Sequence, residues 1–514
     1  MRILLPVLVA VLVAPLALHS QDAARSSTAA GVAATVIARA ARAMGADRLE
    51  TLEYTGTGSS FTVGQAPGPG APWPRFQVVT YVGTINYLLP VMREQMVRRD
   101  VENPPRGGGA GPFTAATGQG GMRPIPGDIN QTQVRDARTD AGAVQIALTP
   151  HGFLKAAAAA AGASVTMRRD TGRDDGRDDV RDDGRSPGRN DGRAVQVVSF
   201  SIGAHPVTGV VNDQGLVERV ETRLFNNVLG DMVVEALFSD YRDYKGVKFP
   251  ARIQQRQAGH PTLDLTVTSV EPNVPSARAL TGPPRQVGPP AAVPSPVRVD
   301  AEKIADHVWF LNGGAPVSLL VEFADHVVVI EGPQGDERTE ATIAAVKQVT
   351  PGKPIRWVVN THHHFDHSGG VRAFVAAGVP ILTHEKNKPY WERILANPFT
   401  LGPDRLARAP RRPVIEGVGA RRILRDASMT LELHHVRGNL HDEALLMAYL
   451  PATKMLVQSD TFHPRPGAAP LAAPPPFTTN LVDNVRRLKL DVQQVVQVHG
   501  GIEPWSAVLK AAGQ

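Results

Sequence analysis

The chain has 514 residues, a length that favours two domains over a single core. Hydrophobic residues make up 42% of it and charged residues 20%, a globular composition that excludes a wholly disordered protein. The net charge of +6 is small for this length, and no basic cluster is interleaved with aromatic residues, so we expect no nucleic-acid partner. The absence of cysteine excludes disulfides, thiol catalysis and lipid attachment through a cysteine.

The amino terminus carries one positive charge, followed by an apolar run over residues 3–18 and then small and polar residues. This pattern is typical of a secretory signal peptide, which we predict at residues 1–22. Pro6 and Pro15 interrupt the run, which is also short for a membrane span, so we expect no stable span after signal removal. The sequence therefore predicts an exported protein of a bacterial envelope, periplasmic or secreted.

Residues 25–280 are predicted to form a β-rich α+β accessory domain. Alanine-rich segments predict helices over 31–44 and 154–161. Alternation of apolar and polar residues predicts strands, and turn signals between the later ones indicate an antiparallel meander. The predicted strands are 52–57, 76–85, 92–98, 195–202, 217–225, 232–241, 251–257 and 263–270.

Three segments lack a helix or strand pattern. Residues 103–127 are rich in proline and glycine and predict a loop, and the prolines at 281–298 predict a semi-rigid linker. Residues 168–193 repeat Gly-Arg-Asp-Asp with eight arginines and eight aspartates, which predicts a disordered insert. A calcium-binding repeat is the alternative, although arginine beside each aspartate would repel the ion.

Residues 241–250, Tyr-Arg-Asp-Tyr-Lys-Gly-Val-Lys-Phe-Pro, resemble a hairpin of periplasmic lipoprotein-carrier-like domains. The resemblance implies a curved sheet with helices on one face, forming a half-open barrel able to hold an acyl chain. A purely structural domain is the alternative interpretation.

The histidines are concentrated late in the chain, since twelve of the sixteen follow residue 300. A β-branched and aromatic run at 355–360 predicts a buried strand, and Thr-His-His-His-Phe-Asp-His-Ser-Gly-Gly follows directly at 361–370. The other elements expected in this part are strands at 308–312, 318–322, 326–330 and 380–383, and helices at 337–349, 371–377 and 385–397.

In this motif, alternate side chains of extended chain share a side, so His362 and His364 can converge on one point. Asp366 and His367 come where the chain must turn, and can address a second point nearby. Imidazole and carboxylate without thiol suit zinc or a similar divalent metal.

Further candidate ligands share a position at the end of a predicted strand, where a rigid scaffold can aim loop residues at one point. They are His441, Asp460 and His499, with strands predicted at 431–436, 455–459 and 495–498. His384 and His463 are expected to line the cleft, and a Pro/Ala-rich segment at 464–476 to cover it. His434 and His435 are expected to be packing or edge residues.

The pattern His362-x-His364-x-Asp366-His367 resembles the signature of the metallo-β-lactamase-fold hydrolases, over about residues 300–514. The resemblance implies an α/β fold class, with a C-terminal αββα metallo-β-lactamase sandwich at 299–514 after the accessory domain. It implies seven ligands for two zinc ions: His362, His364 and His441 for the first, Asp366, His367 and His499 for the second, and Asp460 bridging them. His363 is not a ligand position in that pattern, so its identity is taken as incidental.

We therefore predict an exported, zinc-dependent hydrolase that uses a metal-bound hydroxide on an ester, thioester, lactone or amide bond of a small molecule. Asp366 is the predicted catalytic residue, because its second oxygen can orient the nucleophile and carry a proton to the leaving group. One alternative is a β-lactamase, and another is an envelope lipid- or lipoprotein-carrying protein whose metal domain does not turn over. Export disfavours a nuclease. The sequence leaves the substrate, the metal occupancy and the oligomeric state open.

Overall fold

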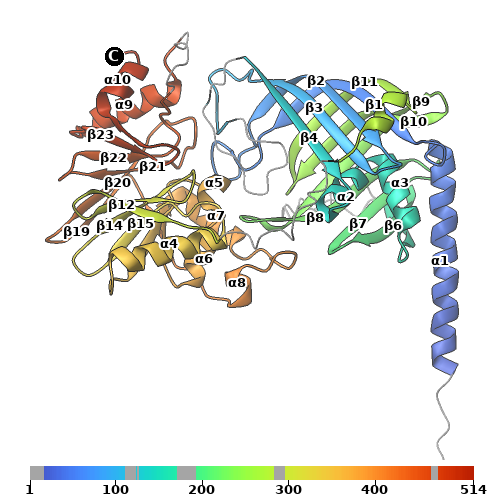
Figure 1. The fold of residues 1–514 in the computed structure, drawn as a ribbon, viewed down its shortest axis with the longest axis horizontal. Coiled ribbons are helices and arrows are strands. Elements are labelled where there is room, and N and C mark those ends of the chain that lie inside the picture. The colour runs from blue at the N-terminus through green and yellow to red at the C-terminus, as the bar shows by residue number, and fades with distance from the viewer. Residues whose placement is uncertain (1–16, 110–122, 124–126, 171–192, 283–295, 465–472) are drawn as a thin grey trace, which may run out of the picture.

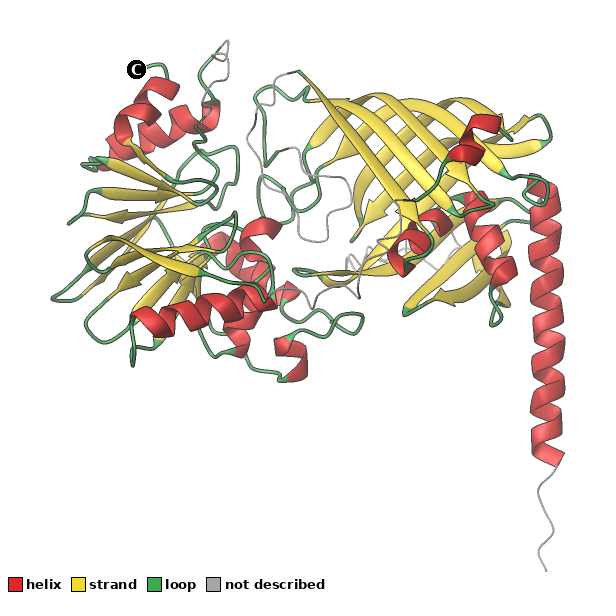
Figure 2. Cartoon of the chain, in the orientation of Figure 1, coloured by secondary structure: helices red, strands yellow, loops and turns green. Residues whose placement is uncertain are grey.

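The computed structural model describes residues 17–109, 123, 127–170, 193–282, 296–464 and 473–514. The chain forms an amino-terminal domain built on one large sheet and a carboxy-terminal domain built on two smaller sheets (Figure 1). In both domains helices lie on outer faces of the sheets, while the first half of the long amino-terminal helix projects away from the amino-terminal domain (Figure 2). Among the described helices, none combines the length and the apolar character needed to cross a membrane.

The amino-terminal sheet has eleven strands in the order β4-β3-β2-β1-β11-β10-β9-β8-β7-β6-β5. All neighbours are antiparallel, which confirms the expected meander, and the first and last strands of the domain pair with each other in the middle of the sheet. The strands are β1 (Thr51–Phe61), β2 (Arg75–Asn86), β3 (Val91–Arg99), β4 (Asp128–Asp136), β5 (Ser164–Asp170), β6 (Arg193–Ile202), β7 (His205–Val211), β8 (Val217–Asn226), β9 (Gly230–Tyr244), β10 (Val247–Gln257) and β11 (His260–Pro272).

One face of this sheet is covered by α2 (Asp140–Ala147), α3 (Pro150–Ala159) and the second half of α1 (Ala17–Met44). Their apolar side chains form one core with alternate strand residues, as Met44 and Phe153 do with Val220. A threonine caps α2 and another caps α3, each accepting a hydrogen bond from a backbone amide of the first turn. The sequence predicted α3 and the second half of α1. It did not predict α2, because a helix of eight residues has too few turns to show a clear apolar repeat.

The structure differs from the predicted boundaries at the Arg/Asp-rich segment. The expected disordered insert at 168–193 is wrong at both ends, because Arg168 belongs to β5 and Arg193 to β6, and these two strands pair. Backbone pairing at a sheet edge depends little on side-chain composition, so the charge pattern concealed this strand. Helix α1 starts at Ala17 and continues past residue 22, the predicted end of the signal peptide. Cleavage of the signal peptide stays a prediction. Residues 171–192 and most of the predicted linker lie outside the described residues.

The carboxy-terminal domain is an αββα sandwich, which confirms the predicted fold class. Apolar residues of both sheets form a core between them, and separate apolar clusters join each sheet to its outer helices. The first sheet contains β12 (Asp300–Ala305), β13 (Val308–Asn312), β14 (Ser318–Glu322), β15 (Val327–Ile330), β16 (Ile355–Val359), β17 (Ile381–His384) and β18 (Ile415–Val418). The second contains β19 (Arg421–Arg425), β20 (Thr430–His435), β21 (Leu446–Leu450), β22 (Met455–Gln458), β23 (Gln494–Gln497) and β24 (Ile502–Pro504). The helices are α4 (Asp336–Val349), α5 (Phe365–Ser368), α6 (Val371–Ala376), α7 (Lys388–Ile394), α8 (Arg405–Arg408), α9 (Pro476–Leu488) and α10 (Trp505–Ala511).

Parallel pairing fixes where the functional loops gather. Strand β16 lies parallel between β15 and β17, and β22 lies parallel to β23 in the facing sheet. The carboxyl ends of parallel neighbours meet at one edge of a sheet, so residues that follow these strands are brought together. The histidine motif follows β16 directly.

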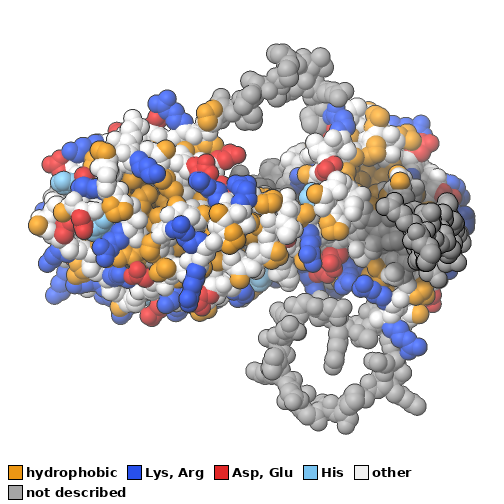
Figure 3. Space-filling model, turned by 90° about the horizontal axis from the view of Figure 1, so that it is seen from below, with side chains coloured by type: hydrophobic (Ala, Val, Ile, Leu, Met, Phe, Trp, Pro, Cys, Tyr) orange, Lys and Arg blue, Asp and Glu red, His pale blue; other side chains and the backbone are white. Residues whose placement is uncertain are grey.

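The two domains are in contact through both apolar and polar groups, with Trp73 and Val228 in one apolar cluster with Phe365. The Asp231 carboxylate at the start of β9 accepts hydrogen bonds from the backbone amides of Thr400 and Leu401 and from the Thr400 hydroxyl. Between the domains lies a cavity of about 1730 Å³. On the face seen in Figure 3, Lys and Arg side chains are interspersed with Asp and Glu rather than gathered in one patch.

Candidate metal centre

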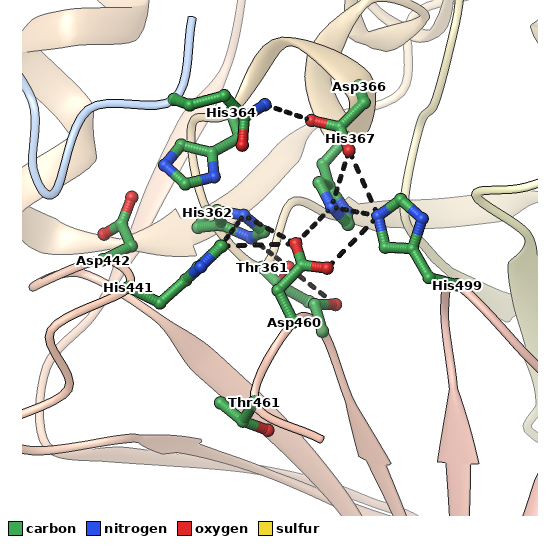
Figure 4. Close-up of polar contacts among 12 residues, drawn as sticks. Thr361, His362, His364, Asp366, His367, His441, Asp442, Asp460, Thr461 and His499 are labelled. Atoms are coloured by element: carbon green, nitrogen blue, oxygen red, sulfur yellow. Dashed lines mark hydrogen bonds and ion pairs between the residues drawn. The ribbon is translucent and has the colours of Figure 1, made fainter. Parts of the chain in front are cut away.

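The histidine motif leaves the end of β16 as extended chain and then enters the one-turn helix α5. His362 and His364 lie on the extended part and are fully buried. The Asn360 amide donates to the His362 carbonyl at 2.7 Å, which fixes the backbone where the strand ends. Asp366 and His367, expected on a turn, lie on α5 and point toward the same space (Figure 4).

The structure brings all seven predicted ligands together, although they come from four separate loops. His441 follows β20, Asp460 follows β22 and His499 follows β23, all on the sheet that faces the motif. Their donor atoms form two groups within each of which all atoms lie within 4.8 Å of one another. The first group is His362, His364, His441 and Asp460, and the second is Asp366, His367, Asp460 and His499.

Asp460 is the residue common to both groups (Figure 4). Its Oδ2 lies 2.8 Å from His367 Nε2 and 3.3 Å from His441 Nε2, and its Oδ1 lies 3.3 Å from His499 Nε2. The Asp460 backbone has φ +61°, a left-handed conformation that non-glycine residues seldom adopt. Strained backbone of this kind is concentrated at functional sites, where the surrounding structure holds it in place.

The donor atoms fit a pair of divalent cations. Imidazole nitrogens face one another, His362 Nε2 at 3.3 Å from His441 Nε2 and His367 Nε2 at 3.0 Å from His499 Nε2. His364 Nδ1 is buried and has no hydrogen-bond partner among the described residues. Histidine and carboxylate ligands without thiol are a donor set that zinc accepts. A cation between such nitrogens would satisfy them all.

Burial and neighbouring charges shift the pKa values of two of these histidines in opposite directions. Burial, followed by the nearby His367, lowers the pKa of His362 to about 4. For His367, burial acts in the same direction, but Asp366, Asp460 and Glu331 outweigh it and hold the pKa well above its ordinary value. A proton on His367 must therefore leave when a metal binds, which couples metal affinity to pH.

His363 has a defined role, so the prediction that its identity is incidental is wrong. Its Nδ1 lies 2.6 Å from Asp442 Oδ2, and both side chains are buried. Burial raises the pKa of the Asp442 carboxyl, but the charge and the hydrogen bond of His363 outweigh this and hold it below its usual range. The ring centroids of His363 and His364 lie 5.3 Å apart, so the pair packs beside the His364 ring. Adjacency of Asp442 to His441 was the available sequence signal.

Glu331, which follows β15, was also missed. Its Oε1 accepts a hydrogen bond from the Ser459 hydroxyl at 2.9 Å and from the Thr361 hydroxyl, and lies 3.4 Å from His367 Nδ1. Such a carboxylate orients a histidine ligand through its second nitrogen. A charged residue directly after a buried apolar strand is the signal that would have found it.

The other histidines differ in their relation to the site. His463 Nε2 lies 3.4 Å from Asp460 Oδ1, and its side chain is 17% exposed. His499 is 15% exposed, while the histidines of the first group are fully buried, so the centre opens on the His463 side. The His384 ring packs at 4.1 Å against that of His435, away from the two groups. Most of the expected covering segment lies outside the described residues.

The amino-terminal domain also reaches the site. A pale blue loop of that domain passes beside His364 in Figure 4. Gln65 and Ala66, which lie between β1 and β2, hydrogen-bond to Asp366 and His364. Nothing in the sequence around Gln65 predicted these contacts.

The sequence and fold were compared with those of known proteins. Residues 311–490 match the family model described as the metallo-beta-lactamase superfamily. Among solved structures, a metallo-beta-lactamase from Pontibacter korlensis is 20% identical, with 42% of this chain and 98% of that chain covered and a TM-score of 0.32. The DIM-1 metallo-beta-lactamase is 15% identical, with 42% and 96% covered and a TM-score of 0.33. The FIM-1 enzyme from Pseudomonas aeruginosa, in its mono-zinc form, is 20% identical, with 43% and 96% covered and a TM-score of 0.31.

A search of curated proteins found no match. The family match covers the β16 motif and two of the three strand-end ligands that join it, His441 and Asp460. The sandwich of two facing sheets with helices on both outer faces agrees with that match. The carboxy-terminal domain of this chain therefore has the metallo-beta-lactamase fold, and its residues 311–490 match the model of that superfamily.

Proposed function

We propose that this protein is a metal-dependent hydrolase that holds two divalent cations, zinc in the first instance, and cleaves an ester, thioester, lactone or amide bond. The observation that supports this most is the convergence of seven side chains into two ligand groups that share the Asp460 carboxylate. A purely structural ion would not need the second group or an open side at His463.

When bound, a pair of cations would activate a water molecule and polarise the substrate oxygen. We assign the acid–base function to Asp366, whose Oδ2 lies 3.1 Å from His499 Nε2 and faces the centre, while its Oδ1 accepts a hydrogen bond from Gln65. Burial of His362, His364 and His441 keeps bulk water from that half of the site. The substrate is therefore expected to arrive on the His463 side.

The lipid-carrier alternative is less well supported. The interdomain cavity is lined by charged side chains, among them Arg219, Glu221, Arg223 and Asp264, which suit a polar molecule better than an acyl chain. The apolar face of the large sheet is already covered by α1, α2 and α3. The resemblance to lipoprotein carriers stays a prediction.

A test combines metal analysis with a panel of chromogenic ester, thioester, lactone, amide and β-lactam substrates. We expect about two zinc ions per chain, and turnover of at least one substrate class that a chelator abolishes and zinc restores. Preference for the β-lactam would assign the β-lactamase alternative. A co-purified lipid, bound metal and no turnover across the panel would favour the carrier, and no bound metal after zinc supply would refute the proposal.

We also propose that the protein is exported, acts on a small molecule and has no nucleic-acid partner. The support is the amino-terminal apolar run after a single positive charge, and the small net charge. Amino-terminal sequencing of the protein from a bacterial envelope fraction tests export. We expect a mature chain that begins near residue 23, whereas an intact Met1 in the cytoplasm would contradict the proposal.

A further inference from the structure

The segment between β1 and β2, residues 62–74, crosses from the amino-terminal domain to the candidate metal centre. Gln65 Nε2 donates a hydrogen bond to Asp366 Oδ1 at 2.8 Å. The Ala66 carbonyl lies 2.7 Å from His364 Nε2. Gln65 is completely buried, so neither contact is a surface encounter of a loosely placed loop.

The contact with Ala66 fixes the tautomer of His364. A backbone carbonyl can only accept a hydrogen bond, so the proton of the neutral His364 ring must be on Nε2. Nδ1 is then left with its lone pair, buried and without a hydrogen-bond partner among the described residues. It is also the nitrogen available to the first ligand group, since Nε2 is taken up by Ala66. A partner of this kind sets the ring orientation of a metal-binding histidine.

The contact with Gln65 fixes which oxygen of Asp366 faces the centre. Oδ1 accepts from the Gln65 amide, while Oδ2 lies 3.1 Å from His499 Nε2 and 3.4 Å from His367 Nε2. Rotation about the terminal bond of the carboxylate would exchange the two oxygens, and the hydrogen bond from the amide opposes that exchange. Gln65 therefore helps to set the direction of the second group's carboxylate.

The loop is held on both sides of these residues. The Gly64 carbonyl accepts from the Phe365 amide at 3.2 Å, and the Pro67 carbonyl accepts from the Glu443 amide at 2.9 Å. Gly64 has φ +73°, and a Cβ added there would lie 2.3 Å from the Phe365 ring. Such close backbone approach positions the loop firmly against α5.

We infer that the amino-terminal domain completes the metal centre, with Gln65 as a positioning residue for Asp366 and the Ala66 carbonyl as the orienting partner of His364. The inference rests on the proposed two-cation site and goes beyond it, because it makes metal affinity a property of both domains. The accessory domain is then a component of the site rather than a separate module.

Two variants of the full-length protein test this inference. Gln65→Met keeps the length of the side chain and removes the donor. Gly108→Ala leaves Gln65 in place but displaces its amide, because a Cβ at Gly108 would lie 1.8 Å from Gln65 Oε1. The matched control is Gln254→Met, which removes a glutamine donor to Asp264 at 3.2 Å within the large sheet. Circular dichroism verifies that each variant is folded.

The readouts are zinc affinity by chelator competition and the visible spectrum of the cobalt(II)-loaded protein. We expect both test variants to bind the more weakly held ion about 10- to 100-fold less tightly and to change the cobalt spectrum. Gln254→Met should match the wild type in both. Wild-type affinity and spectrum in folded Gln65→Met and Gly108→Ala would overturn the inference, as would faster turnover with unchanged affinity, which would identify the loop as a barrier. Absence of metal from the wild type would instead refute the proposed function.

Discussion

Replacing Asp460 by asparagine removes one negative charge from the middle of the site while nearly preserving the shape of the side chain. The carboxylate contacts the imidazoles of both groups, and its shortest contact is 2.8 Å, to His367 Nε2. A hydrogen bond to a charged group contributes about 1.5–3 kcal/mol. Because a divalent cation carries more charge than an imidazolium, this range is a lower bound for the loss on metal binding. It corresponds to roughly 10- to 150-fold weaker binding.

The assay is zinc content by mass spectrometry after dialysis at a fixed, buffered free zinc concentration, with circular dichroism to check the fold. We expect the wild type to retain about two ions per chain and Asp460→Asn one or none. Glu432→Gln is the matched control, because Glu432 Oε2 lies 2.8 Å from His434 Nε2 in a similar carboxylate–imidazole pair outside the site. If folded Asp460→Asn retained two ions with wild-type affinity, the assignment of Asp460 as the shared ligand would be refuted.

Three further predictions concern pH and the domain interface. Burial lowers the pKa of His151 to about 4, so as pH falls the unfolded chain takes up this proton before the folded chain does. The amino-terminal domain should therefore lose roughly 2 kcal/mol of unfolding free energy between pH 7 and pH 5. Urea titrations should show a smaller dependence of unfolding free energy on pH in His151→Gln, and an unchanged dependence would contradict this prediction. Because the pKa of His367 is raised, a proton competes with the metal for this side chain. Apparent zinc affinity in chelator titrations should therefore increase from pH 6 to pH 8. An affinity that does not change with pH would contradict this competition. Asp231→Ala removes the carboxylate that accepts hydrogen bonds from Thr400. Amide exchange at residues 397–402 should then be about 10-fold faster in hydrogen-exchange mass spectrometry. Unchanged exchange would show that this contact does not stabilise the interface.

The carboxy-terminal site was largely predictable because its information is local. The apolar run at 355–360 identifies a buried strand, and the histidines and aspartate that follow it lie within six positions of one another. The same logic found Asp460 and His499, each at the end of an apolar strand. Backbone periodicity and the geometry of strand ends are properties that a short segment carries by itself.

Other features followed composition less well. Strand β5 extends into the Arg/Asp-rich segment because an edge strand needs only backbone partners, here those of β6. No role was predicted for His363, because His362 and His364 on either side of it account for the metal-ligand pattern. Its partner Asp442 is 79 positions away, and only the folded chain places the two side chains 2.6 Å apart.

The sequence by itself determined the motif, the two β-rich parts and the chemistry of the ligand set, because residue type and spacing decide these. Only the tertiary structure decided that Gln65 donates to Asp366, 301 positions later, and that the Ala66 carbonyl orients His364. The physical reason is that these contacts depend on how two domains dock. Docking is set by many weak contacts spread over the chain, and no short segment encodes it.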